Sequence, residues 1–429
     1  MADTNHELSS TKELHERPAD APSEHASESD IVHISPFALL SLMVGISLAA
    51  FLVALDRTIV ANAIPYITNE FKSPDDAGWY GSAASLESLT TILLLLFFHP
   101  SKTNRGQEGS FVTRILRLDL IGNLILTATV VMLLLVLQWG GIEYRWGSSR
   151  IIGLLVASGV GFVLFGLWQH KKGAEALTPL SIMANRGVAA SIGVMFFLSG
   201  AFLVHSYYLP YWFQAVRGRT PVQSGVDLTP YVATSFVFSM IAGIAVNKLG
   251  YFTPPTIIGC AIGCVGCGLL TTLHVDTSTA TWAGYQVLTS AGMGMAMQQP
   301  IIAVQAILEP DLISIGSAIV LFAQGLSGAI FVSVANNVLR NELAQNLVKL
   351  RIPNVSGILA AGATDVRELV PQAFRLPLIE AYNDALSKVF IMAIPFCGIA
   401  LLFALGLPWV SVKKKQAERG GQAVVAMEG

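Results

Sequence analysis

The chain is poor in charged residues. Lys, Arg, Asp and Glu make up 13% of its 429 residues, hydrophobic residues make up 53%, and the mean hydropathy is +0.59. A soluble globular domain usually carries about 25% charged residues. The composition therefore excludes a soluble globular chain and indicates an integral membrane protein. The formal net charge is only −2, and no stripe of Lys and Arg is present, so nucleic acid is excluded as an expected partner.

Cysteine is scarce, and no grouping of residues suggests an enzyme. All 4 cysteines lie in apolar stretches, where thiols mostly act as small packing residues: Cys260, Cys264, Cys267 and Cys397. Three of them have helical spacing, but a metal site would want a fourth ligand, and His274 lies beyond the expected helix end. We expect packing there, no disulfide framework, no metal and no cofactor. The histidines are scattered singly, without a nucleophile beside them, so an enzyme is the poorest fit.

Apolar runs of about 20 residues, long enough to cross a bilayer as helices, recur along the chain. They lie near 37–56, 79–98, 119–140, 150–169, 187–209, 226–247, 255–273, 281–304, 314–338 and 387–410. We predict an all-α polytopic membrane bundle with two spans in 35–98 and eight in 99–412. A disordered acidic tail at 1–34, an outer loop at 340–385 and a basic tail at 413–429 complete the expected organisation.

Basic residues orient these spans. Lys102 follows the second run, Lys171 the fourth and Lys413 the last, all on one side of the membrane. Because basic loops stay in the cytoplasm and the number of spans is even, both termini are predicted to be cytoplasmic. The 340–385 loop then lies outside, and its Asn354-Val355-Ser356 sequence makes Asn354 a candidate for N-glycosylation.

An acid and a base stand at the end of the first apolar run, at Asp56 and Arg57. Each costs about 2.5 to 3.5 kcal/mol at the centre of an inserted helix, so such residues are usually functional. The pair predicts a transporter, in which a neighbouring base would tune the acid for proton coupling. The alternative is that both reach interfacial water and only fix topology. Asn62 and Pro65 would shape and end the helix, with Asn62 facing the substrate path.

Several longer stretches carry a family resemblance. They are LDRTIVANAIPYITNEF at 55–71, YYLPYWFQAVRG at 207–218 and GMGMAMQQP at 292–300. Together they resemble the major facilitator superfamily, in its fourteen-helix drug:proton antiporter branch, and within it fungal pumps that export toxins or secondary metabolites. The resemblance implies proton-coupled export of a small organic molecule from the cell, through the plasma membrane, a vacuolar or vesicular membrane being the alternative. No Walker-type phosphate loop is present, which favours a proton gradient over ATP.

One departure from this family is large. After Ser82-Ala83-Ala84-Ser85 the chain passes directly into a stretch that resembles the sixth helix of the family, so about four helices look deleted and two half-helices fused near 84–90. The second and sixth helices of the family run in the same direction, and the later bundle can therefore insert normally. The chain is then a shortened gene model or isoform, a degraded copy, or a protein whose missing wall a second chain supplies. Glu87, at the junction, is interpreted as an accidental charge.

Polar residues within the later spans are the remaining candidates. Asp227 begins the sixth span and either takes part in protonation or faces the outer water. Tyr208, Tyr211 and Gln214 end the fifth span, where aromatic residues either form an interfacial belt or suit a flat, partly apolar substrate.

Amides interrupt the eighth span at Gln298, Gln299 and Gln305. Unsatisfied polar groups are costly in lipid, so these amides are expected to face a cavity or a partner helix, next to a backbone loosened by Pro300. The leading interpretation is a proton-coupled exporter of a toxin or secondary metabolite. A non-transporting remnant, a partner of an intact pump, and a transporter of siderophores or other organic solutes are the alternatives.

Overall fold

The computed structural model describes residues 119–418, apart from 142, 174–177, 361–365, 367–369 and 416. The first two predicted spans lie outside these residues, as do Asp56, Arg57, Asn62 and Glu87.

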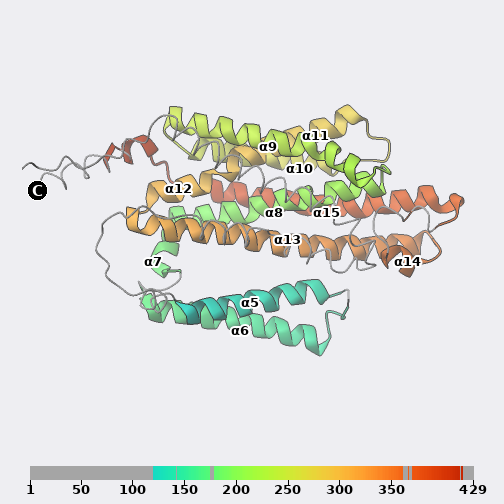
Figure 1. Cartoon of the computed structure of the whole chain (residues 1–429), viewed down its shortest axis with the longest axis horizontal. Helices are drawn as coiled ribbons and strands as arrows, with labels where there is room; N and C mark the ends of the chain where they lie inside the picture. Colours follow the sequence, from blue (N-terminus) through green and yellow to red (C-terminus); the bar gives the residue numbers. More distant parts are fainter. Residues whose placement is uncertain are drawn as a thin grey trace, which may run out of the picture. The chain divides into compact units, whose positions relative to one another are not determined.

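Helices make up almost all of the described chain (Figure 1). The long ones are α5 (Leu120–Trp139), α6 (Ser149–Lys172), α8 (Arg186–Ala215), α9 (Pro221–Leu249), α10 (Thr253–Leu270), α11 (Thr279–Met297), α13 (Ile313–Lys349) and α15 (Arg375–Leu405). The short ones are α7 (Leu180–Met183), α12 (Gln299–Ile307), η3 (Pro310–Leu312), α14 (Val355–Ala360) and η4 (Gln372–Phe374). Within the described part, 7 helices are long and apolar enough to cross a membrane. The prediction of an all-α polytopic membrane fold is confirmed.

Two of the predicted spans differ from the helices observed. The run at 281–304 is divided into α11 and α12, with the break at Gln298. The predicted outer loop at 340–385 is much shorter, because α13 continues to Lys349 and α15 already begins at Arg375. Charged residues end the apolar run in this region, yet Leu339, Leu343 and Leu347 remain buried at intervals of four. That spacing keeps one face of the helix packed after the opposite face has become polar.

The long helices from α8 onward pack as two interlocked units of three helices. The first unit is α8, α9 and α10, and the second is α11, α13 and α15. α8 lies against α13 and α15, and α11 lies correspondingly against α9 and α10, while α10 and α15 contact each other. The first helix of each unit therefore packs on the second and third helices of the other. Since successive spans alternate in direction, the two first helices run oppositely, which is the arrangement of an inverted repeat.

The backbones of α10 and α11 approach each other closely within this bundle. A Cβ added at Gly292 would lie 2.3 Å from the backbone nitrogen of Gly263, and one added at Gly266 would lie 2.4 Å from the Cα of Thr289. Small residues in both helices thus bring the two backbones into direct contact, as is common between transmembrane helices.

The helices α5 and α6 form a hairpin of their own that touches the bundle at α13. The side-chain amide of Asn337 in α13 donates a hydrogen bond of 2.6 Å to the carbonyl of Leu137. That carbonyl lies in the last turn of α5, where carbonyl groups lack partners within their own helix. Asn337 therefore satisfies the end of α5 and joins the hairpin to the bundle.

Candidate transport site

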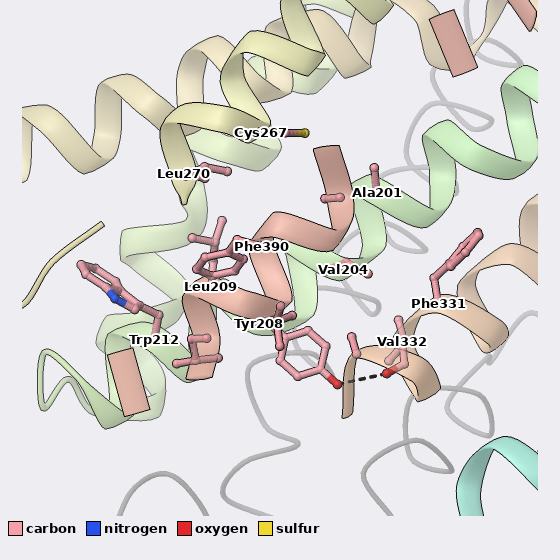
Figure 2. Packing of buried hydrophobic residues seen from close by; sticks show 14 of the residues in the cluster. Ala201, Val204, Tyr208, Leu209, Trp212, Cys267, Leu270, Phe331, Val332 and Phe390 are labelled. Atoms are coloured by element: carbon pink, nitrogen blue, oxygen red, sulfur yellow. Dashed lines mark hydrogen bonds between the residues drawn. The ribbon is translucent and has the colours of Figure 1, made fainter. Parts of the chain in front are cut away.

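Polar side chains on α8 connect this central helix to three of its neighbours. The hydroxyl of Tyr208 donates to the carbonyl of Val332 in α13 at 3.0 Å (Figure 2), and the indole nitrogen of Trp212 donates to Asn383 Oδ1 in α15 at 2.9 Å. Two residues further on, Gln214 Nε2 donates to the hydroxyl of Ser224 in α9 at 3.0 Å. These bonds hold the C-terminal half of α8 in one orientation relative to α9, α13 and α15.

Two of the three residues predicted at the end of this span are therefore buried and bonded. Tyr208 retains 4% of its accessible surface and Gln214 retains 2%. Tyr211 is half-buried, and its ring centroid lies 5.7 Å from that of Tyr208. Among the three, Tyr211 is the one whose ring a small molecule could reach without rearranging the bundle.

Asp227 lies near the start of α9, beside a base. Its Oδ2 atom is 2.9 Å from Nε of Arg219, and the carboxylate is mostly shielded, with 15% of the side chain exposed. The amide of Gln286 in α11 donates to the backbone carbonyl of Asp227 at 3.1 Å. The neighbouring Arg217 donates to the carbonyl of Val275, in the α10–α11 connection, at 2.7 Å. The bonds of Arg217, Arg219 and Gln286 thus join the end of α8, the start of α9 and the α10–α11 connection with α11.

The three amides predicted near the break between α11 and α12 differ in their exposure to solvent. Gln298 occupies the break itself, with φ −86° and ψ −17°, and its side chain is exposed. Gln305 is also exposed, and at a spacing of seven residues it lies on the same helix face. Gln299 is fully buried; its Nε2 donates to the carbonyl of Met295 at 3.1 Å, and its Oε1 has no hydrogen-bond partner among the described residues. Pro300 follows, and its missing N–H explains why the helix does not continue unbroken.

Sequence reasoning did not single out His205 or Gln286 as polar residues of the core. Both are fully buried, and His205 stacks on Phe390 with ring centroids 5.6 Å apart. Neither ring nitrogen of His205 has a hydrogen-bond partner among the described residues. The signal available in the sequence was their position within apolar runs, which is where polar groups cost most.

The cysteines pack as expected. Cys267 of α10 and Cys397 of α15 are buried, and their sulfur atoms lie 3.5 Å apart as free thiols. In the connection between α13 and α15, Asn354 is exposed with φ +60°, and its Oδ1 accepts a hydrogen bond from the backbone N–H of Gly357 at 3.3 Å. A glycan on Asn354 remains a prediction.

Comparison with known families identifies the family of this chain. The model of the fungal trichothecene efflux pump family (TRI12) matches residues 34–364. The chain belongs to this family. Its relatives include the MFS-type transporter astH of Aspergillus oryzae, 39% identical over 333 residues that make up 77% of this chain and 59% of the relative. The MFS-type efflux pump elcC of Phaeosphaeria nodorum is 38% identical over 334 residues, covering 77% of this chain and 59% of that protein.

A third relative, the efflux pump aflT of Aspergillus parasiticus, is 35% identical over 327 residues, which are 76% of this chain and 63% of the relative. This TRI12-family chain thus spans about three-fifths of the length of the relatives it matches. The predicted resemblance to major facilitator efflux pumps is confirmed, and the chain is a multi-pass membrane protein of a transporter family and not an enzyme.

Proposed function

We propose that this chain is a secondary active transporter that exports a small organic toxin or secondary metabolite in exchange for protons. The TRI12 family match and the efflux pumps among its relatives support the class of activity. The observation that carries the substrate path is the interrupted helix α11–α12, which exposes Gln298 and Gln305 on one face.

Interrupted helices suit a binding site in a membrane because the break frees backbone groups and places amides where a ligand can use them. Gln298 offers two donors and an acceptor beside an otherwise apolar helix. A flat, mostly apolar molecule with a few carbonyl or hydroxyl groups matches such a surface. In this proposal Gln298 and Gln305 contact the substrate, Gln299 fixes the break from the buried side, and Tyr211 lies further along the path.

Proton coupling is assigned to Asp56 and Arg57, with Asp227 as a second site. Asp227 faces Arg219 at 2.9 Å, so a proton arriving on the carboxylate would remove the charge that holds the arginine. Such an exchange would loosen the α8–α9 connection, which carries Arg219, from the start of α9. Asn62 belongs to the same first span as the Asp56–Arg57 pair and is proposed to face the substrate.

Alternating access would move the long helices from α8 to α15 as one body against the rest of the transporter. The side-chain bonds from α8 to α9, α13 and α15 support this, because they resist rotation of single helices within the body. We further propose the plasma membrane as the location, with both termini in the cytoplasm.

The decisive test is efflux from fungal cells that express this chain, using a panel of fluorescent lipophilic compounds and fungal metabolites. We expect export that a protonophore abolishes. Gln298→Leu should lower export of at least one compound without lowering the amount of folded protein, whereas Asn247→Leu, which removes an exposed amide near the end of α9, should not. Export that is absent, or indifferent to the protonophore, would overturn the proposal.

A second candidate function is that of a non-transporting remnant or a partner of an intact pump. The match covers only about three-fifths of the length of these relatives, which favours it. Sequencing the transcript across codons 80 to 95 separates the two: an in-frame insert of about four helices restores a complete pump. If the short transcript is correct and cells expressing it show no gradient-dependent export, the remnant or partner is the better description.

A further inference from the structure

The end of the last span is folded back across the turn between α9 and α10. An antiparallel bridge pairs Tyr251 with Ser411, and the N–H of Val412 donates to the carbonyl of Gly250 at 2.8 Å. The hydroxyl of Thr253 donates to the carbonyl of Pro408 at 2.9 Å. Gly250 has φ +80°, a left-handed conformation that ends α9 and lets the chain reverse there. These contacts fix the segment that follows α15 against the membrane-spanning helices.

This fold-back gathers lysines and aromatic rings on one surface, which we call the basic-aromatic patch. Its members are Lys248, Tyr251, Trp409, Lys413, Lys414 and Lys415. All four lysines are exposed, as are 65% of Trp409 and 38% of Tyr251, whose ring centroids lie 6.3 Å apart. Among the described residues, Glu418 is the acid that pairs with the patch, at 3.2 Å from Lys415. The surface is therefore strongly positive and partly apolar.

One lysine of the patch, Lys413, is held in place by the fold. Nζ of Lys413 donates to the backbone carbonyl of Lys248 at 2.8 Å, which joins the segment after α15 to the end of α9. An ammonium group has three donors, so two of those on Lys413 remain for an acceptor outside the protein. Basic loops that only orient a membrane protein need positive charge, but they do not need lysines fixed to the ends of other helices.

The position of the patch relative to the bilayer follows from the helix ends. α9 ends at Leu249, α10 begins at Thr253 and α15 ends at Leu405, so three apolar spans terminate beside it. The ends of apolar helices mark the edge of the hydrocarbon layer, and exposed Trp and Tyr rings favour that level. By the distribution of basic loops this edge is the cytoplasmic one, where anionic lipids are concentrated.

We propose that the basic-aromatic patch binds the headgroup of an anionic phospholipid. The lysines contact its phosphate and any further acidic group, and the rings of Tyr251 and Trp409 lie against the upper part of the acyl chains. The site is independent of transport, and it would anchor the ends of α9, α10 and α15 to the cytoplasmic leaflet.

Native mass spectrometry of the purified full chain in detergent tests the proposal, with phosphatidylserine and phosphatidylcholine as probes. We expect phosphatidylserine to bind more tightly. Near a charged surface each lysine contributes about fivefold in binding constant, so Lys414→Gln/Lys415→Gln should weaken phosphatidylserine binding about 25-fold. The matched control is Lys171→Gln/Lys172→Gln, which removes the same charge from the exposed end of α6 and should change binding far less.

Trp409→Leu gives a second readout, since it leaves every charge in place and should weaken both lipids by a similar factor. Size-exclusion elution and the unfolding temperature in phosphatidylcholine confirm that each variant is folded. Equal affinity for the two lipids would overturn the proposal, as would equal losses from the two double lysine variants. Full displacement of phosphatidylserine by inorganic phosphate would also overturn it, because it would mark a site for a free anion.

Discussion

Replacing Gly292 by alanine tests the direct backbone contact between α10 and α11. The added methyl carbon would lie 2.3 Å from the nitrogen of Gly263 and 2.6 Å from the carbonyl oxygen of Gly259. Ordinary contacts of a Cβ begin near 3.4 Å, so α10 and α11 would have to separate by roughly 1 Å along this contact. The clashing atoms belong to the backbone of α10, and no side-chain rotation can relieve the overlap.

The loss of stability expected for Gly292→Ala follows from overpacking. Forcing an extra methyl group into a packed interior destabilises a protein by about 1 to 3 kcal/mol, and the upper end applies when backbone must move. Gly284 in the same helix supplies the control, because nothing lies within 4 Å of its added Cβ. Gly284→Ala should stabilise the helix by about 0.4 to 1 kcal/mol, since alanine loses less backbone freedom on folding. Both exchanges replace glycine by alanine, but we expect Gly292→Ala to lower the stability of the protein and Gly284→Ala to raise it.

The assay is thermal unfolding of the purified protein in one detergent, followed by the exposure of buried cysteines to a thiol-reactive dye. We expect a lower unfolding temperature for Gly292→Ala and an equal or higher one for Gly284→Ala. If the two variants unfold at the same temperature, the direct backbone contact between α10 and α11 is wrong.

Three further predictions concern individual contacts. Mild oxidation should cross-link Cys267 to Cys397, whose sulfur atoms lie 3.5 Å apart, and Cys267→Ser should prevent it; a protease site inserted between them makes the bond visible by electrophoresis. Trp212→Phe and Asn383→Ala should each destabilise the protein, with a coupling of about 1 kcal/mol in a double-mutant cycle of unfolding, and purely additive losses would contradict their hydrogen bond. Glycosidase treatment of protein from fungal membranes should increase its electrophoretic mobility, and Asn354→Gln should match the treated form; an untreated mobility already equal to that of the variant would exclude the glycan.

The span positions were largely predictable from the sequence because each depends on a local property. A run of about 20 apolar residues must form a helix in lipid, where no water satisfies the backbone. The residues at which the helices end were less predictable. Leu343 and Leu347 continue α13 past its apolar run, since a helix that packs on another needs only one apolar face.

The candidate site was predictable in composition but not in orientation. The sequence singled out Gln298, Gln299 and Gln305 because amides are costly in an apolar helix. It did not indicate that Gln299 is buried while the other two are exposed, because that depends on which helices pack against α12. The partners of Tyr208 and Trp212 lie more than a hundred residues away along the chain, and no local pattern identifies them.

The sequence by itself determined that this is a polytopic membrane protein, that it resembles the major facilitator pumps, and which side of the membrane its basic loops favour. These follow from hydropathy, motifs and charge, which act over a few residues or along one span. Only the tertiary structure decided that α8 is fixed to three neighbours, that α10 and α11 touch through glycines, and that the chain after α15 returns to the α9–α10 turn. Those arrangements are set by the complementary shapes of distant helices, a property that belongs to no single segment.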